Sequence, residues 1–148
     1  MLVTAAIFYL FVILIVILYG WQPSISNGYY LEKVGNWFTG WAISVGVLLF
    51  ITQVQVNPLV LFPSFGFIVV GLAPKFKSWQ KTIHYLGAMF IILGGCAMVA
   101  YNDWFMGLYA AMLIGMFSLI PMKNRIFWIE IIAFTILILL LGFTGLRL

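Results

Sequence analysis

The feature that most constrains this chain is an apolar run at its start. Residues 2–19 read LVTAAIFYLFVILIVILY and contain no charged side chain. A helix needs roughly 20 mostly apolar residues to cross a hydrocarbon core about 30 Å thick. The run lacks the basic start and small-residue cleavage site of a secretory signal peptide, so we expect it to remain as a membrane-spanning helix.

Five further apolar runs follow, separated by short polar segments. Of the 148 residues, 66% are hydrophobic and 7% are charged, whereas soluble domains average roughly a quarter charged residues. This composition excludes a water-soluble globule. The sequence therefore predicts one all-α domain over residues 1–148, a polytopic integral membrane bundle of six transmembrane helices with short loops. The expected spans are 2–19, 37–55, 58–73, 83–101, 104–122 and 126–146.

The third expected span differs from the others because it is short and contains Pro63 beside Ser64 and Gly66. Proline interrupts the hydrogen-bond ladder of a helix, and neighbouring helices can satisfy the freed backbone groups. We therefore expect this span to be kinked or tilted.

Basic residues concentrate in alternate loops. In a six-span chain the first, third and fifth loops lie on one side of the membrane, and they hold six of the seven Lys and Arg residues. The positive-inside rule places these loops in the cytoplasm and both termini outside, in a cell (inner) membrane. Basic loops beside helices mainly set topology and contact anionic headgroups, so membrane lipids are expected partners and nucleic acid is not.

Because the first, third and fifth loops share one membrane face, the polar residues in and beside these loops are expected at that face. The first loop contains several hydroxyl groups and an acid, His84 opens the fourth span, and Glu130 lies about one turn into the sixth. We expect a shared polar pocket there for a ligand. Its candidate residues are Ser24, Ser26, Tyr29, Tyr30, Glu32, His84 and Glu130.

Glu130 is the strongest single candidate for a residue of the polar pocket. An acid embedded in a membrane helix costs a few kcal/mol unless it is paired or faces a cavity. The candidate partners are His84, Arg125 and a hydroxyl group of the first loop. The alternative is that Glu130 fastens helices together, or lies at the membrane rim with no ligand.

A catalytic site is harder to build from these residues. His84 suits a proton relay or a hydrogen bond between helices. No nucleophile elbow surrounds Ser24 or Ser26, so no catalytic residues are expected. With Cys96 as the single cysteine and His84 as the single histidine, we expect neither a metal site nor a cofactor.

Small residues recur every four positions in two of the expected spans. Gly107, Ala111 and Gly115 do so in the fifth, and Gly40 and Ser44 in the second. Such stripes permit close helix approach, so we expect these faces to be helix–helix contacts. Glycines in the third and fourth spans are expected to pack in the same way, with a lipid or solute groove as the alternative.

Three short motifs carry a family resemblance. PSISNGYY follows the first span, IHYLGAMF opens the fourth and FWIEIIAF opens the sixth. In this order they resemble six-span proteins related to the damage-regulated autophagy modulator family and similar uncharacterised bacterial membrane proteins. The matching positions are Pro23, Ile25, Ser26, His84, Gly87, Ala88, Trp128 and Glu130.

The resemblance implies a role in lipid-related membrane organisation. This chain departs from the family in the segment NGYYLEKVGN, which replaces an acidic or Gly-Pro-rich continuation. Family members also keep the first loop on the non-cytoplasmic side, whereas the lysine distribution here favours the cytoplasm.

Four functions are compatible with these residues. The favoured one is a non-catalytic multi-pass membrane protein that binds a lipid headgroup or a partner protein at the polar pocket. The others are a small channel or transporter, an accessory subunit of a membrane complex, and, least favoured, a lipid-modifying enzyme. A membrane-protein partner or a homo-oligomer is compatible with the first and third.

Overall fold

In the computed structural model, residues 2–25, 35–121 and 123–145 are described, and they form an all-helical chain without strands. Each α-helix begins and ends within three residues of a predicted span, which confirms the all-α prediction. The 3₁₀ helices η2 (Pro58–Val60) and η3 (Ala73–Trp79) flank α3. The α-helices are α1 (Leu2–Tyr19), α2 (Gly35–Gln53), α3 (Leu61–Leu72), α4 (Gln80–Asn102), α5 (Trp104–Leu119) and α6 (Arg125–Gly145).

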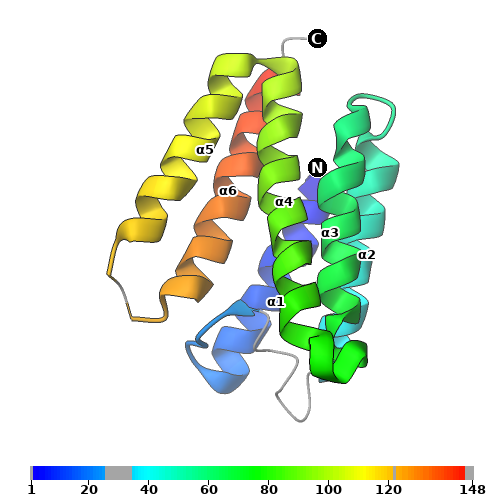
Figure 1. Cartoon of the computed structure of the whole chain (residues 1–148), viewed down its shortest axis with the longest axis vertical. Coiled ribbons are helices and arrows are strands. Elements are labelled where there is room, and N and C mark those ends of the chain that lie inside the picture. The colour runs from blue at the N-terminus through cyan, green and yellow to red at the C-terminus, as the bar shows by residue number, and fades with distance from the viewer. Residues whose placement is uncertain (1, 26–34, 122, 146–148) are drawn as a thin grey trace.

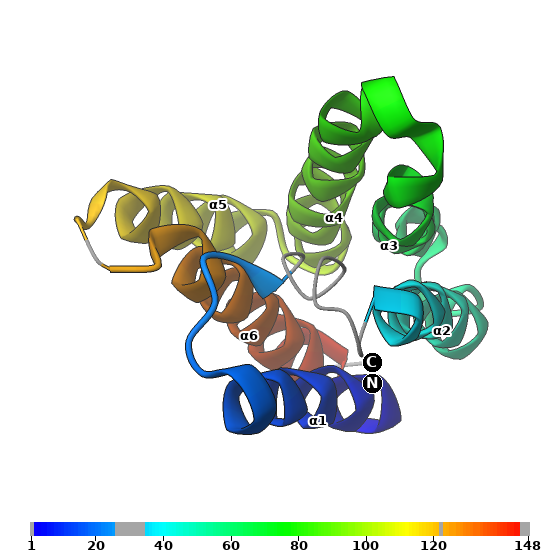
Figure 2. The same ribbon diagram turned by 90° about the horizontal axis from the view of Figure 1, so that it is seen from below.

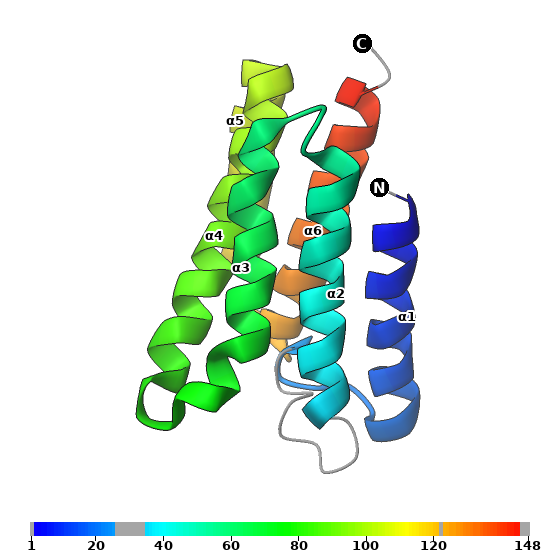
Figure 3. The ribbon, with the colours of Figure 1, turned by 90° about the vertical axis from the view of Figure 1, so that its right-hand side faces the viewer.

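The helices lie side by side as one bundle (Figure 1). Viewed along the bundle, α1, α2, α3, α4 and α6 surround a common centre, and α5 packs outside them against α4 and α6 (Figure 2). The end of α1, η3 and the turn between α5 and α6 lie at one end, and the α2–α3 and α4–α5 turns lie at the other (Figures 1 and 3). The described parts of the first, third and fifth connections therefore lie at one end of the bundle, as the sequence predicted.

Three segments are long and apolar enough to cross a membrane by length and composition. They are Leu2–Tyr19, Pro58–Phe76 and Gln80–Asn102, and Trp104–Leu119 is a shorter apolar helix. Large apolar side chains of α1, including Leu10 (65% exposed) and Ile17 (73% exposed), point away from the bundle. Soluble monomers rarely expose contiguous apolar faces of this kind.

Glycines bring the backbones of α2, α3 and α4 together. A Cβ atom on Gly66 of α3 would lie 2.6 Å from the carbonyl oxygen of Gly87 in α4. A Cβ atom on Gly46 of α2 would lie 2.6 Å from the carbonyl oxygen of Ser64. Because real Cβ atoms do not approach this closely, these positions accept only glycine without a shift of the helices. The expected glycine packing of α3 and α4 is confirmed.

Aromatic side chains, in contrast, join α1 to α6. The rings of Phe8 and Phe134 stack with their centroids 3.7 Å apart. Next to them, the Tyr9 hydroxyl and Thr135 Oγ1 form a hydrogen bond of 2.6 Å. Large side chains, and not close backbones, therefore hold α1 against the rest of the bundle.

The expected small-residue stripes are mostly wrong. Gly107 is buried against Ala100 as predicted, but a Cβ atom on Gly40 or Gly115 would meet nothing within 4 Å. Ser44 and Ala111 are exposed as well. Spacing alone fixes which residues share a helix face, but it does not say whether that face meets another helix.

Pro63 does not interrupt α3, for a local reason. Pro63 lies in the first turn of α3, which continues without a break from Leu61 to Leu72. Backbone N–H groups in a first turn have no intrahelical acceptor, so proline removes no bond there.

Candidate functional site

The start of the first loop docks onto the start of α6. The N–H of Phe127 donates to the carbonyl oxygen of Pro23 at 3.0 Å, and Asn124 Nδ2 donates to the carbonyl oxygen of Trp21 at 3.4 Å. The first N–H groups of a helix have no intrahelical acceptor, so the loop supplies acceptors that the helix lacks. This contact fixes residues 21–25 beside the bundle.

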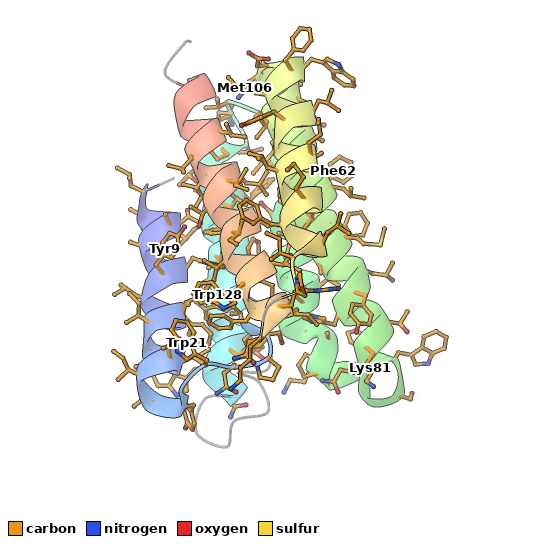
Figure 4. All side chains as sticks on the ribbon, turned by 90° about the vertical axis from the view of Figure 1, so that its left-hand side faces the viewer. Tyr9, Trp21, Phe62, Lys81, Met106 and Trp128 are labelled. Carbon is orange, nitrogen blue, oxygen red and sulfur yellow. The ribbon has the colours of Figure 1, made fainter. Side chains whose placement is uncertain are left out.

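Aromatic contacts strengthen the same docking. The ring of Trp21 lies 5.9 Å from that of Phe127 and 5.0 Å from that of Trp128, measured between centroids. Trp21 and Trp128 lie close together between α1 and α6 in Figure 4. Phe127 is fully buried.

Glu130 holds the end of this segment. The backbone N–H of Ile25 donates to Glu130 Oε2 at 2.5 Å. The sequence suggested His84, Arg125 or a first-loop hydroxyl as the partner. The observed partner is none of these three groups, because the donor is the backbone N–H of a first-loop residue, and no ion pair joins Glu130 to another described residue. This hydrogen bond fastens Ile25 to α6.

Beside Glu130 lies a cavity of about 90 Å³ at the centre of the bundle. A water molecule needs roughly 10–15 Å³ of such volume, so the cavity has room for more than one small group. Side chains from α1, α2, α3, α4 and α6 line it, and Ile25 closes part of its wall. Most of the lining is apolar, and Glu130 and His84 supply its ionisable groups.

A second cavity of about 160 Å³ adjoins the first. The two share His84, Phe38 and Val70. The second is more polar, because its lining also includes Ser24, Gln80, Lys81 and Tyr85.

The second cavity lies at the end of the bundle that holds the described basic side chains, which we call the basic end. Lys81 marks this end on the first turn of α4 (Figure 4). The exposed basic residues there are Lys75, Lys81, Lys123 and Arg125.

Of the predicted site residues, Ser24, His84 and Glu130 meet around this pair of cavities. Ser26, Tyr29, Tyr30 and Glu32 lie outside the described residues, so their participation stays a prediction.

Sequence reasoning missed two parts of the site. Lys81 was read as a topology signal, although it lies one turn before His84 on α4. The aromatic lining, including Trp41 and Phe134, was missed because aromatic residues are common throughout the chain. Phe134 could have been predicted as a site residue, because it lies four residues after Glu130 and the two therefore share one helix face.

The described residues include no group of three or more His, Cys, Asp or Glu side chains placed to hold a metal ion. A comparison with protein-family models, curated proteins and solved structures finds no match for the chain. The resemblance to the damage-regulated autophagy modulator family accordingly stays a prediction.

Proposed function

We propose that this chain is a six-span integral membrane protein with its basic end in the cytoplasm. Three apolar segments of membrane-spanning length and the outward apolar face of α1 support this. The helices α2 and α6, with 19 and 21 residues, reach about 30 Å at a rise of 1.5 Å per residue.

Exposed aromatic residues at both ends agree with this placement. Trp37 and Trp79 lie at the basic end, and Tyr101 and Trp104 at the other, each more than half exposed. Tryptophan and tyrosine favour the two membrane interfaces.

The function that the site supports best is binding of a lipid headgroup without catalysis. The observation that carries this is the pair of adjoining cavities, one at the centre of the bundle and one at its basic end, which Ser24, Lys81, His84 and Glu130 line. Lys81 offers a cation to a headgroup phosphate, and Ser24 and Gln80 add polar side chains to the same lining. Basic pockets on the cytoplasmic side of membrane helices suit this chemistry.

Binding is better supported than conduction. Beyond the first cavity lies a third of about 30 Å³, lined by Thr4 and otherwise by apolar side chains and glycine. A channel needs a continuous set of polar or charged groups along its path. The polar side chains therefore line the two cavities nearer the basic end and do not continue along the bundle as a channel requires.

The test is lipid-dependent thermal stability of the purified protein. Anionic phospholipid should raise the unfolding temperature of the wild type, and Lys81→Ala should remove most of that increase. Lys75→Ala is the matched control, because Lys75 is also exposed at the basic end but lies outside both cavities. Equal lipid stabilisation of the two variants would contradict a headgroup site at Lys81.

A further inference from the structure

Glu130 shares the first cavity with His84, but no described Lys or Arg side chain lines that cavity. Among the described residues its hydrogen-bond donor is the backbone N–H of Ile25, which carries no charge. The described Lys and Arg side chains are exposed at the rim of the bundle. An embedded carboxylate without a cation is costly, so the site favours a positively charged ligand.

Aromatic rings that contact one another line the cavity beside Glu130. Four of them form a closed circuit, with centroids 5.6 Å apart for Phe8 and Trp41, 6.5 Å for Trp41 and Phe67, 5.8 Å for Phe67 and Phe134, and 3.7 Å for Phe134 and Phe8. Phe38 joins this group through Trp41, 5.5 Å away. All five rings line the cavity of Glu130, and we call them the aromatic wall.

An aromatic wall and a carboxylate attract the same kind of ligand. The face of an aromatic ring is electron-rich and attracts cations, above all quaternary ammonium groups that shed water easily. From this arrangement we infer that the cavity binds an organic ammonium group, with Glu130 as its counter-charge and the aromatic wall around its methyl or methylene groups.

Other ligand classes fit the same wall poorly. An anion would meet the carboxylate of Glu130 in a medium of low dielectric constant. A neutral apolar ligand would make no use of Glu130. A bare divalent cation prefers several oxygen ligands, and the described lining offers one carboxylate.

The inference deepens the proposed function and rests on the same pair of cavities. The second cavity, with Lys81, adjoins the first through His84. A zwitterionic headgroup would place its ammonium group against Glu130 and its phosphate near Lys81. A free quaternary ammonium ion would use the first cavity alone.

The test is calorimetric titration of the protein in phosphatidylglycerol nanodiscs, which contain no ammonium lipid. The probes are choline and 3,3-dimethylbutan-1-ol, which has the same shape with carbon in place of nitrogen. We expect choline to bind saturably and the alcohol to bind at least about tenfold more weakly, because the cation supplies the attraction. This comparison needs no mutation.

Two variants assign the binding to the cavity. Glu130→Gln keeps an oxygen that accepts from the Ile25 N–H, and it should weaken choline binding by at least about tenfold. Trp41→Leu should weaken it by a smaller factor, whereas Trp37→Leu, on the exposed face of α2, should leave it unchanged. Thermal unfolding of each variant shows that the fold is retained.

Three results would overturn the inference. They are no choline binding by the wild type, equal binding of the alcohol, and unchanged choline binding by folded Glu130→Gln. If Lys81-dependent lipid stabilisation persists in any of these cases, the proposed function stands without the ammonium site.

Nanodiscs that also contain phosphatidylcholine identify the source of the ammonium group. Weaker binding of free choline in these nanodiscs identifies a lipid headgroup as its competitor. Unchanged binding identifies a free organic cation as the ligand of the ammonium site, and the Lys81-dependent lipid stabilisation then decides the proposed function separately.

Discussion

Two parts of the bundle differ in how their helices pack together. The helices α2, α3 and α4, which we call the glycine sector, touch through backbone atoms at Gly46, Gly66 and Gly87. The helices α1 and α6 with residues 21–25, which we call the aromatic sector, touch through large side chains such as Phe8 and Phe134. Close backbones leave no space between helices, whereas large side chains hold helices apart. The cavities lie where the aromatic sector faces the glycine sector.

The largest effect is expected from filling the glycine sector. Gly66→Leu would force a side chain into the backbone of Gly87, and overpacking of this kind should lower the free energy of unfolding by more than about 3 kcal/mol. Gly40→Leu is the control, because a Cβ atom there meets nothing within 4 Å. Denaturant titration in detergent measures both, and similar stabilities would show that the glycine sector is not tightly packed.

Reversal of the charge at Glu130 should come next. Glu130→Lys cannot accept from the Ile25 N–H and embeds a cation near His84, so we expect a loss of about 3 kcal/mol. Glu130→Gln keeps an acceptor and should lose about 1 kcal/mol. The same titration separates the two, and equal stabilities would show that Glu130 does not hold the first loop.

The smallest effect is expected from a single hydrogen bond of the aromatic sector. Tyr9→Phe removes the bond to Thr135 and should cost about 0.6 kcal/mol, the average for such bonds between membrane helices. Tyr109→Phe, at an exposed position of α5, should cost nothing. A loss at Tyr9 as large as that at Gly66 would remove the distinction between the two sectors.

Much of the fold could be predicted from the sequence because membrane-length apolar runs leave few alternatives to helices. Loop parity predicted that His84 and Glu130 approach one membrane face, but it could not predict that both line one cavity. The partner of Glu130 could not be predicted, since it is the backbone N–H of Ile25 and every residue except proline has such a group.

The packing faces were harder to predict than the helices. Gly40 and Gly115 have the spacing of a contact stripe but lie on exposed faces. Gly46 carries a real contact with α3, yet nothing in its immediate sequence distinguishes it from Gly40. The rotation of each helix about its axis depends on its neighbours, and periodicity along one helix does not contain that information.

The central claim is that the two adjoining cavities hold a lipid headgroup, and native mass spectrometry of the gently purified protein tests it most directly. The measurement identifies any lipid that stays bound to the wild type and to Lys81→Ala. We predict one retained lipid class in the wild type and its loss in Lys81→Ala, with Lys75→Ala as the unchanged control. A wild-type protein without lipid, or one retained only with a partner subunit, would contradict the claim.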